Sequence, residues 1–141
     1  MRVFLIALSF FATAALAECP NVGGSWILED GSLKGEVSQT LCSSIKFVEI
    51  GSSWSQTKRF ELDGRRRLVQ TLQTSDGDVT YYNTGSYTSD QIILRRETWL
   101  NDQRVIDLNW NFSLDTDVLI ETIVRSEDGS ISNSVRKWQR Q

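Results

Sequence analysis

The chain has no histidine among its 141 residues. Ser-His-Asp and Cys-His nucleophilic systems, His-ligated haem and typical zinc sites all require that side chain. The sequence has two cysteines, and because we expect them to form one disulfide, no thiolate remains for a metal site. Most acidic residues fall in predicted turns, where carboxylates bond to the local backbone, so a carboxylate pair for glycoside hydrolysis is not indicated. We therefore expect no enzyme, no metal site and no cofactor.

Proline and helical periodicity are also scarce. Pro20 is the single proline, so no later strand lacks a ladder donor. The segments after it are rich in β-branched and aromatic residues, and turn signals such as Asp63-Gly64 recur between them. Only residues 34–41 could form a turn of helix, and their Gly and β-branched residues make it weak. We expect strands at 24–29, 43–50, 53–62, 66–74, 78–88, 91–100, 103–114, 118–127 and 131–139.

Alternation of apolar and polar residues is clearest over 106–114. The apolar residues of that segment share one face of a strand: Ile106, Leu108, Trp110, Phe112 and Leu114. A flat sheet of so many strands would expose two long edges, and closure into a barrel removes them. We therefore predict an all-β fold, an antiparallel up-and-down meander closed into a barrel of about eight to ten strands. A two-sheet β-sandwich is the alternative.

The first residues indicate a secretory signal peptide. An apolar stretch follows Arg2 and ends in Ala15-Leu16-Ala17, a small-residue cleavage signal. The stretch is too short to span a membrane. We expect a signal peptide over 1–17, a single domain over 18–141, a secreted or periplasmic location and no integral membrane segment after cleavage. In an oxidising compartment the two cysteines, Cys19 and Cys42, should form a disulfide.

Charge gives little reason to expect a nucleic-acid partner. The formal net charge is −3, so phosphate backbones are disfavoured on bulk charge. The basic run Arg65-Arg66-Arg67 is a local exception. Because it follows the turn signal Asp63-Gly64, we interpret it as a solvated hairpin shoulder in preference to an anion site.

The segment Gly24-Ser25-Trp26, at the start of the first predicted strand, resembles the Gly-x-Trp signature of the lipocalins and related barrels. The resemblance implies that Trp26 closes one barrel end beneath a basic residue of the last strand. Arg136 is the residue that we assign to this contact, and Lys137 and Arg140 are also in reach. A guanidinium over an indole ring suits that place because its charge stays partly hydrated. The resemblance also implies a carrier of small molecules.

Five tryptophans are more than the average for a chain of this size. Each of them can be explained as a core residue or a barrel-end plug, and the alternative is that some of them line a pocket. We predict a binding site for a small apolar or aromatic ligand, formed by Trp54, Gln56, Lys58, Phe60, Tyr81 and Trp110. Trp99 and Tyr87 are further aromatic candidates, and Gly85, Ser55 and Asn83 are the small residues expected to leave interior space. Lys58 would supply a polar contact there, unless a bulge reverses the face and leaves it in solvent.

Two other functions are consistent with the sequence. Small periplasmic inhibitors of secreted hydrolases, such as bacterial lysozyme inhibitors, are similar in outline because they combine a signal peptide, a compact barrel and a disulfide. A secreted protein would then be the partner, and an exposed segment at 30–41 or 63–67 would make the contacts. A structural domain with a filled core and no ligand is the third interpretation.

Overall fold

Ten strands follow one another in the computed structural model, which describes residues 18–141. No helix occurs in this part of the chain. The strands are β1 (Gly24–Leu28), β2 (Lys34–Thr40), β3 (Ser44–Ile50), β4 (Ser55–Glu61), β5 (Arg67–Thr74), β6 (Gly77–Tyr87), β7 (Gln91–Leu100), β8 (Gln103–Asp115), β9 (Val118–Glu127) and β10 (Ser130–Arg140). The predicted signal peptide, 1–17, lies outside the described residues.

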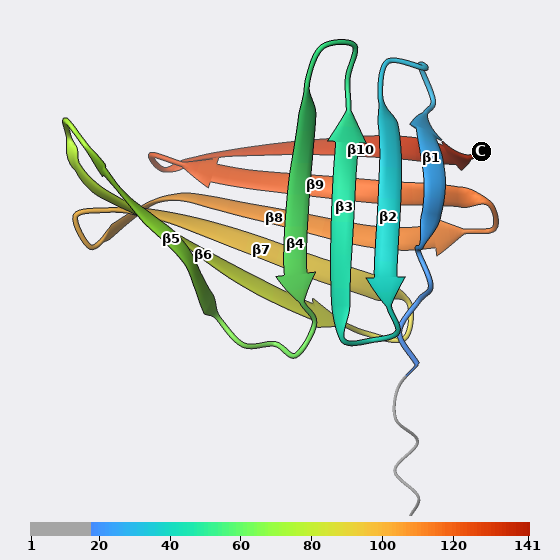
Figure 1. Cartoon of the computed structure of the whole chain (residues 1–141), viewed down its shortest axis with the longest axis horizontal. Coiled ribbons are helices and arrows are strands. Elements are labelled where there is room, and N and C mark those ends of the chain that lie inside the picture. The colour runs from blue at the N-terminus through green and yellow to red at the C-terminus, as the bar shows by residue number, and fades with distance from the viewer. Residues whose placement is uncertain (1–17) are drawn as a thin grey trace, which may run out of the picture.

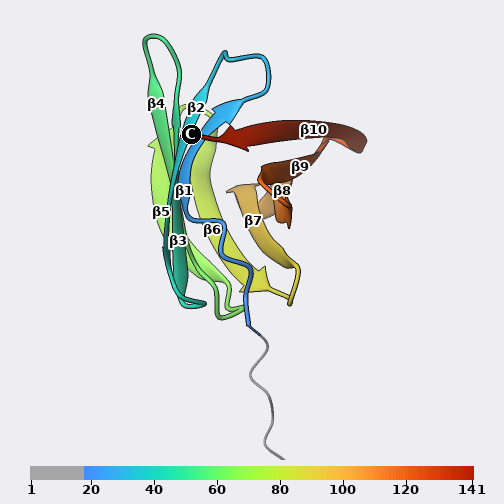
Figure 2. The ribbon, with the colours of Figure 1, turned by 90° about the vertical axis from the view of Figure 1, so that its right-hand side faces the viewer.

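All ten strands belong to one antiparallel sheet, with the order β4-β3-β2-β1-β10-β9-β8-β7-β6-β5. This is the order of an up-and-down barrel, with β1 paired to β10, and its hydrogen-bonded ladder is open between β4 and β5. The sheet curls strongly, so that β1–β4 lie crosswise over β6–β10 (Figure 1) and enclose the interior from one side (Figure 2). The predicted all-β antiparallel meander is confirmed, in the form of a half-barrel.

The opening beside β4 is partly covered by a close approach to β6. Gly64 N donates to Gly85 O (2.8 Å), and Asn83 Nδ2 donates to Arg59 O (3.2 Å). A Cβ at Gly85 would collide with the backbone carbonyl oxygen of Glu61. Gly85 therefore allows two strand backbones to touch. A side-chain bond and a single backbone bond replace a ladder at this seam.

The segment 34–41 was not predicted as a strand and was the only stretch in which a helical turn was considered, but residues 34–40 form β2. Buried Gly35 and Val37 alternate there with exposed polar residues, which is the period of a strand. Gly35 suits its place because a Cβ would lie 3.1–3.3 Å from the rings of Phe47 and Trp138. Packing against those rings outweighs the weak local preference.

One end of the interior is filled by a closely packed core. The ring of Phe47 meets the edge of Trp138 at a centroid distance of 5.6 Å and lies 5.4 Å from Phe112. Phe60 packs against Trp110 at 6.0 Å. Such tilted and edge-on contacts are the favoured geometries for aromatic pairs. These rings fill the interior at this end of the half-barrel.

The N-terminal arm is fixed to this filled end. The predicted disulfide between Cys19 and Cys42 is confirmed and ties the arm to the turn between β2 and β3. Val22 is fully buried, and its carbonyl oxygen accepts a hydrogen bond from Trp26 Nε1 (3.1 Å). By the chain-entropy model, closing a loop of this length stabilises the fold by about 3 kcal/mol.

Trp26 is fully buried at the same end, and a basic residue of β10 covers it. That residue is Arg140, whose guanidinium carbon lies 4.6 Å from the ring centroid. The assignment of Arg136 to this contact is corrected: Trp26 pairs in register with Arg140, and Arg136 bonds to Glu49 in the interior.

We predict that Gly85→Ala destabilises the fold by about 1–3 kcal/mol, the usual cost of overpacking. Replacement of glycine by alanine in a strand usually stabilises the fold. At Gly85 the collision with the Glu61 carbonyl should make the change destabilising. Urea denaturation measures the difference, and Ser86→Ala on the opposite face of β6 is the control. Equal midpoints for the two variants would show that the seam is not tightly packed.

Candidate functional site

Along several strands, the inward-facing residues change from apolar to charged. On β3, Ile45 and Phe47 are followed by Glu49, and on β7, Leu94 is followed by Arg96. On β9, Leu119 is followed by Glu121. The register places Arg96 beside Leu108 and places Glu121 deeper, beside Phe112 and Arg136. Glu49 bonds to both Lys58 and Arg136, so most of these charges face one cleft. The interior is therefore apolar at the disulfide end and charged at the other.

At the charged end lies a cleft of about 340 Å³. Strands β3 and β4 form one wall, and β7–β10 form the other. This volume is at the low end of the range, roughly 300–1,000 Å³, of small-molecule sites. The lining residues are Glu49, Gln56, Lys58, Arg96, Leu108, Trp110, Ile123, Arg125, Ser132, Asn133, Ser134 and Arg136.

A buried ion pair forms the base of the cleft. Lys58 Nζ donates to Glu49 Oε2 at 2.7 Å, and the two side chains are only 5% and 4% exposed. The ammonium also lies 5.0 Å from the centroid of the Trp110 ring and 5.4 Å from that of Phe47. A charge with this little water needs such partners, because removal of one would leave the other uncompensated.

Arg136 joins the two walls of the interior. Its Nη1 donates to Glu49 Oε1 at 2.7 Å, so each oxygen of that carboxylate accepts a bond from a different cation. The same Nη1 lies 3.7 Å from Oε2 of Glu121. Glu49 belongs to β3, whereas Arg136 belongs to β10. This contact crosses the interior from one wall to the other.

Glu121 lies beneath this network and is fully buried. Its Oε2 accepts a hydrogen bond from Trp138 Nε1 (3.0 Å), whereas Oε1 has no hydrogen-bond partner among residues 18–141. Burial raises the pKa of the Glu121 carboxyl, and Glu49 adds to the effect; Lys58, Arg136 and the Trp138 bond oppose it. The folded protein therefore binds this proton more tightly than the unfolded chain does.

Arg96 differs from the other cations of the cleft. Its one hydrogen bond to residues 18–141 runs from Nε to Asn83 Oδ1 (2.9 Å), and its guanidinium carbon lies 5.9 Å from the Phe60 ring centroid. Burial lowers the pKa of Arg96, and within the described chain no carboxylate offsets this. The guanidinium is therefore a partly desolvated cation without an anionic partner.

The predicted ligand-binding residues divide into two groups. Gln56, Lys58 and Trp110 line the cleft, and Phe60 is buried behind Trp110. Lys58 faces inward, so the reading that places it in solvent is wrong. Tyr81 lies on β6 outside the lining.

Trp54 precedes β4 and packs over Gly51 with 49% of its surface exposed. Trp54 is therefore not part of a strand, and it does not line the cleft. Glu49, Arg96 and Glu121 were not predicted from the sequence as site residues. The pattern that could have predicted them is a charged residue two positions after an apolar residue on the inward face of a strand.

The convex face of the sheet carries a second polar cluster. The guanidinium carbon of Arg66 stacks 3.5 Å from the ring centroid of Tyr82, and its Nε donates to Glu97 Oε2 (2.7 Å). Arg95 binds Asp107 through two bonds of 2.9 and 2.6 Å, which lower the pKa of that carboxyl. Arg104 lies 3.3 Å from Asp107. Because each arginine has a carboxylate, this cluster holds β6–β8 together and offers no free charge.

The basic run 65–67 is largely engaged as well. Arg67 donates to both oxygens of Asp63, at 2.6 and 2.7 Å, and these bonds lower the pKa of the Asp63 carboxyl. Arg66 belongs to the convex cluster, so the expected solvated shoulder applies to Arg65, whose side chain is 82% exposed.

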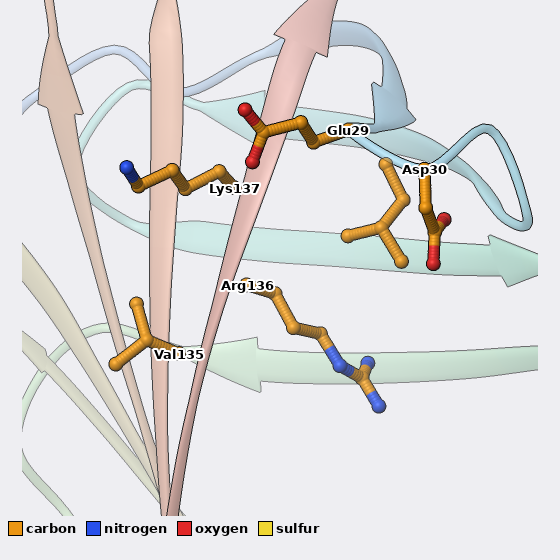
Figure 3. A pocket seen from close by; sticks show the side chains of 6 residues that line it. Glu29, Asp30, Val135, Arg136 and Lys137 are labelled. Carbon is orange, nitrogen blue, oxygen red and sulfur yellow. The ribbon is translucent and has the colours of Figure 1, made fainter.

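A shallower hollow on the outer side lies where β1 ends beside β10. It is lined by Leu28, Glu29, Asp30, Val135, Arg136 and Lys137. Figure 3 shows Val135 and Lys137 on one side of β10, whereas the Arg136 side chain points to the other. This alternation places Arg136 inside and leaves Lys137 exposed.

No protein-family model matches the chain, and no curated protein matches it. Among residues 18–141, no group of three or more Cys, Asp or Glu side chains is arranged to hold a metal ion. Within the same range, no helix has the length and apolar character needed to cross a membrane.

We predict that Glu121→Gln stabilises the protein at neutral pH by a few degrees in melting temperature. The pKa of Glu121 is higher in the folded protein than in the unfolded chain. As pH rises from about 4, the unfolded chain therefore loses this proton first, and the native protein loses stability until the pH passes the folded-state pKa. In the variant, the amide oxygen of the glutamine still accepts the hydrogen bond from Trp138. The glutamine does not titrate, so this loss of stability does not occur. Melting temperatures between pH 3 and 8 test this, with exposed Glu61→Gln as control. A variant less stable than the native protein at pH 7 would contradict it.

Proposed function

We propose that the protein binds a small apolar or aromatic molecule in the cleft between β3–β4 and β7–β10, as a lipocalin-like carrier outside the cytoplasm. The observation that carries this proposal is the contrast between the two ends of the interior. Aromatic rings fill one end, whereas the other holds a cleft of about 340 Å³. The disulfide is consistent with an oxidising compartment.

The lining of the cleft supports an amphipathic ligand. Trp110, Leu108 and Ile123 supply an apolar wall, and charged and amide side chains stand opposite it. Ligand sites commonly combine such a wall with a few polar groups that orient the ligand. Trp110 is only 3% exposed and is held by Phe60 behind it and by the Lys58 ammonium over its ring, so its position is fixed before a ligand binds.

Titration with N-phenyl-1-naphthylamine tests this function. This uncharged aromatic probe gains emission in an apolar site, and we expect saturable binding at micromolar concentration. Trp110→Leu should weaken binding at least fivefold, because it removes the aromatic wall. Trp54→Leu, an exposed position outside the cleft, is the control and should bind as the native protein does.

Ser134→Phe provides a second variant that leaves the core intact, since Ser134 is exposed and lines the cleft. The larger side chain should occupy the space and reduce probe binding. If the folded native protein does not bind the probe, or if Ser134→Phe binds it as well as the native protein does, the proposal is wrong.

An exposed edge strand favours a second candidate function, the binding of a secreted protein such as a hydrolase. All eight residues of β5 are exposed, and β5 has no neighbour on one side. Leu68 and Leu72 are 60% and 46% exposed, and an unpaired strand of this kind can pair with another chain. On this reading the protein would inhibit a lysozyme, and Leu72→Lys would abolish the inhibition. If an excess of the protein does not inhibit lysozyme in an activity assay, lysozyme is not its target.

A further inference from the structure

We propose that the ligand of the cleft carries an anionic group, a carboxylate or sulfonate on an apolar or aromatic body, and that Arg96 binds this group. The inference rests on the proposed function and specifies its ligand class. It begins from charge: the whole chain has a net charge of −3, yet the cleft is lined by four cationic side chains and one carboxylate. The lining therefore has the opposite sign to the protein.

Three of these four cations already have carboxylate partners. Lys58 and Arg136 bond to the two oxygens of Glu49, at 2.7 Å each. Arg125 bonds to Glu127 on its own strand, at 2.6 Å. These pairs saturate their charges and leave little affinity for a further anion.

Arg96 is the cation that remains. It has no ion pair among residues 18–141, and its Nε is held by Asn83, which fixes the guanidinium. Burial has removed part of its water, so the cost of desolvation is already met in the free protein. An anion in the cleft would restore the missing partner, and a guanidinium can bind a carboxylate or sulfonate through two bonds.

The neighbours of Arg96 determine the rest of the ligand. Arg96 pairs in register with Leu108 of β8, and Trp110 follows two residues later on the same face. An anionic group at Arg96 thus places the attached body against the apolar wall. A purely polar anion such as phosphate would leave this wall without contact, so the geometry favours an amphipathic anion of modest size.

Two probes that differ by a single sulfonate test the inference. They are 8-anilinonaphthalene-1-sulfonate and N-phenyl-1-naphthylamine, which share one ring system. The native protein should bind the sulfonate at least tenfold more tightly, and that preference should decrease with added salt. Arg96→Met should lower affinity for the sulfonate about tenfold and change that for the uncharged probe less than twofold.

Lys137→Met is the matched control, because it removes one positive charge from the exposed face of β10, outside the cleft. It should change neither affinity. Circular dichroism establishes that each variant is folded; if Arg96→Met is not, Arg96→Gln replaces it. Binding of neither probe by the native protein would refute the proposed function itself. Binding of both with equal affinity, or an equal loss of both in the Arg96 variant, would refute only the assignment of an anionic ligand.

Discussion

The bond between Arg136 and Glu49 holds the open end of the half-barrel together. Aromatic packing joins the two crossed layers at the disulfide end and stops at Trp110, which lines the cleft. There, a carboxylate from β3 accepts bonds from Lys58 on β4 and from Arg136 on β10. Buried ions are costly, so each of them needs the others. In return they keep the walls at a fixed spacing without filling the space with apolar side chains.

The two faces of the same sheet use arginine differently. On the convex face, Arg66, Arg95 and Arg104 each have a carboxylate, and the first also stacks on Tyr82. On the concave face, Arg96 has an amide in place of a carboxylate. A charged side chain that only stabilises the fold is normally paired with an opposite charge, because an unpaired buried charge is unfavourable. The difference in pairing therefore separates a cluster that stabilises the sheet from a residue available for a ligand.

The sequence was sufficient to predict the local features of the fold. Period-two hydrophobicity and Asx-Gly turns are local, and they identified nine of the ten strands. The disulfide was predicted because the chain has only two cysteines and was expected in an oxidising compartment. The missing strand, β2, depends on Gly35 packing against Phe47 and Trp138, which come from elsewhere in the chain. Whether Arg136 or Arg140 covers Trp26 depends on the β1–β10 register, and the open ladder at β4 depends on the contact at Gly85. Such long-range contacts have no local pattern.

The site was predicted in part for the same reason. Gln56, Lys58 and Trp110 were found because they share an inward face with apolar neighbours. Trp54 was included because the strand was expected to begin at residue 53, whereas β4 begins at Ser55. Arg96 was missed although Ile92 and Leu94 precede it on the same face. A charged residue at the end of the apolar face of a strand can be hydrated or buried. Which of the two occurs depends on the residues that face it across the interior, and these come from other parts of the chain.

The most direct test of an anion-binding cleft is a nuclear magnetic resonance titration of the native protein with 1-naphthoate. The Nε–Hε signals of the arginines and the indole signals of the tryptophans report on each face separately. The account predicts that the signals of Arg96 and Trp110 shift together and saturate, while those of Arg104 and Trp99 stay unchanged. Shifts confined to the convex face, or an Arg96 signal that does not move while Trp110 does, would contradict it.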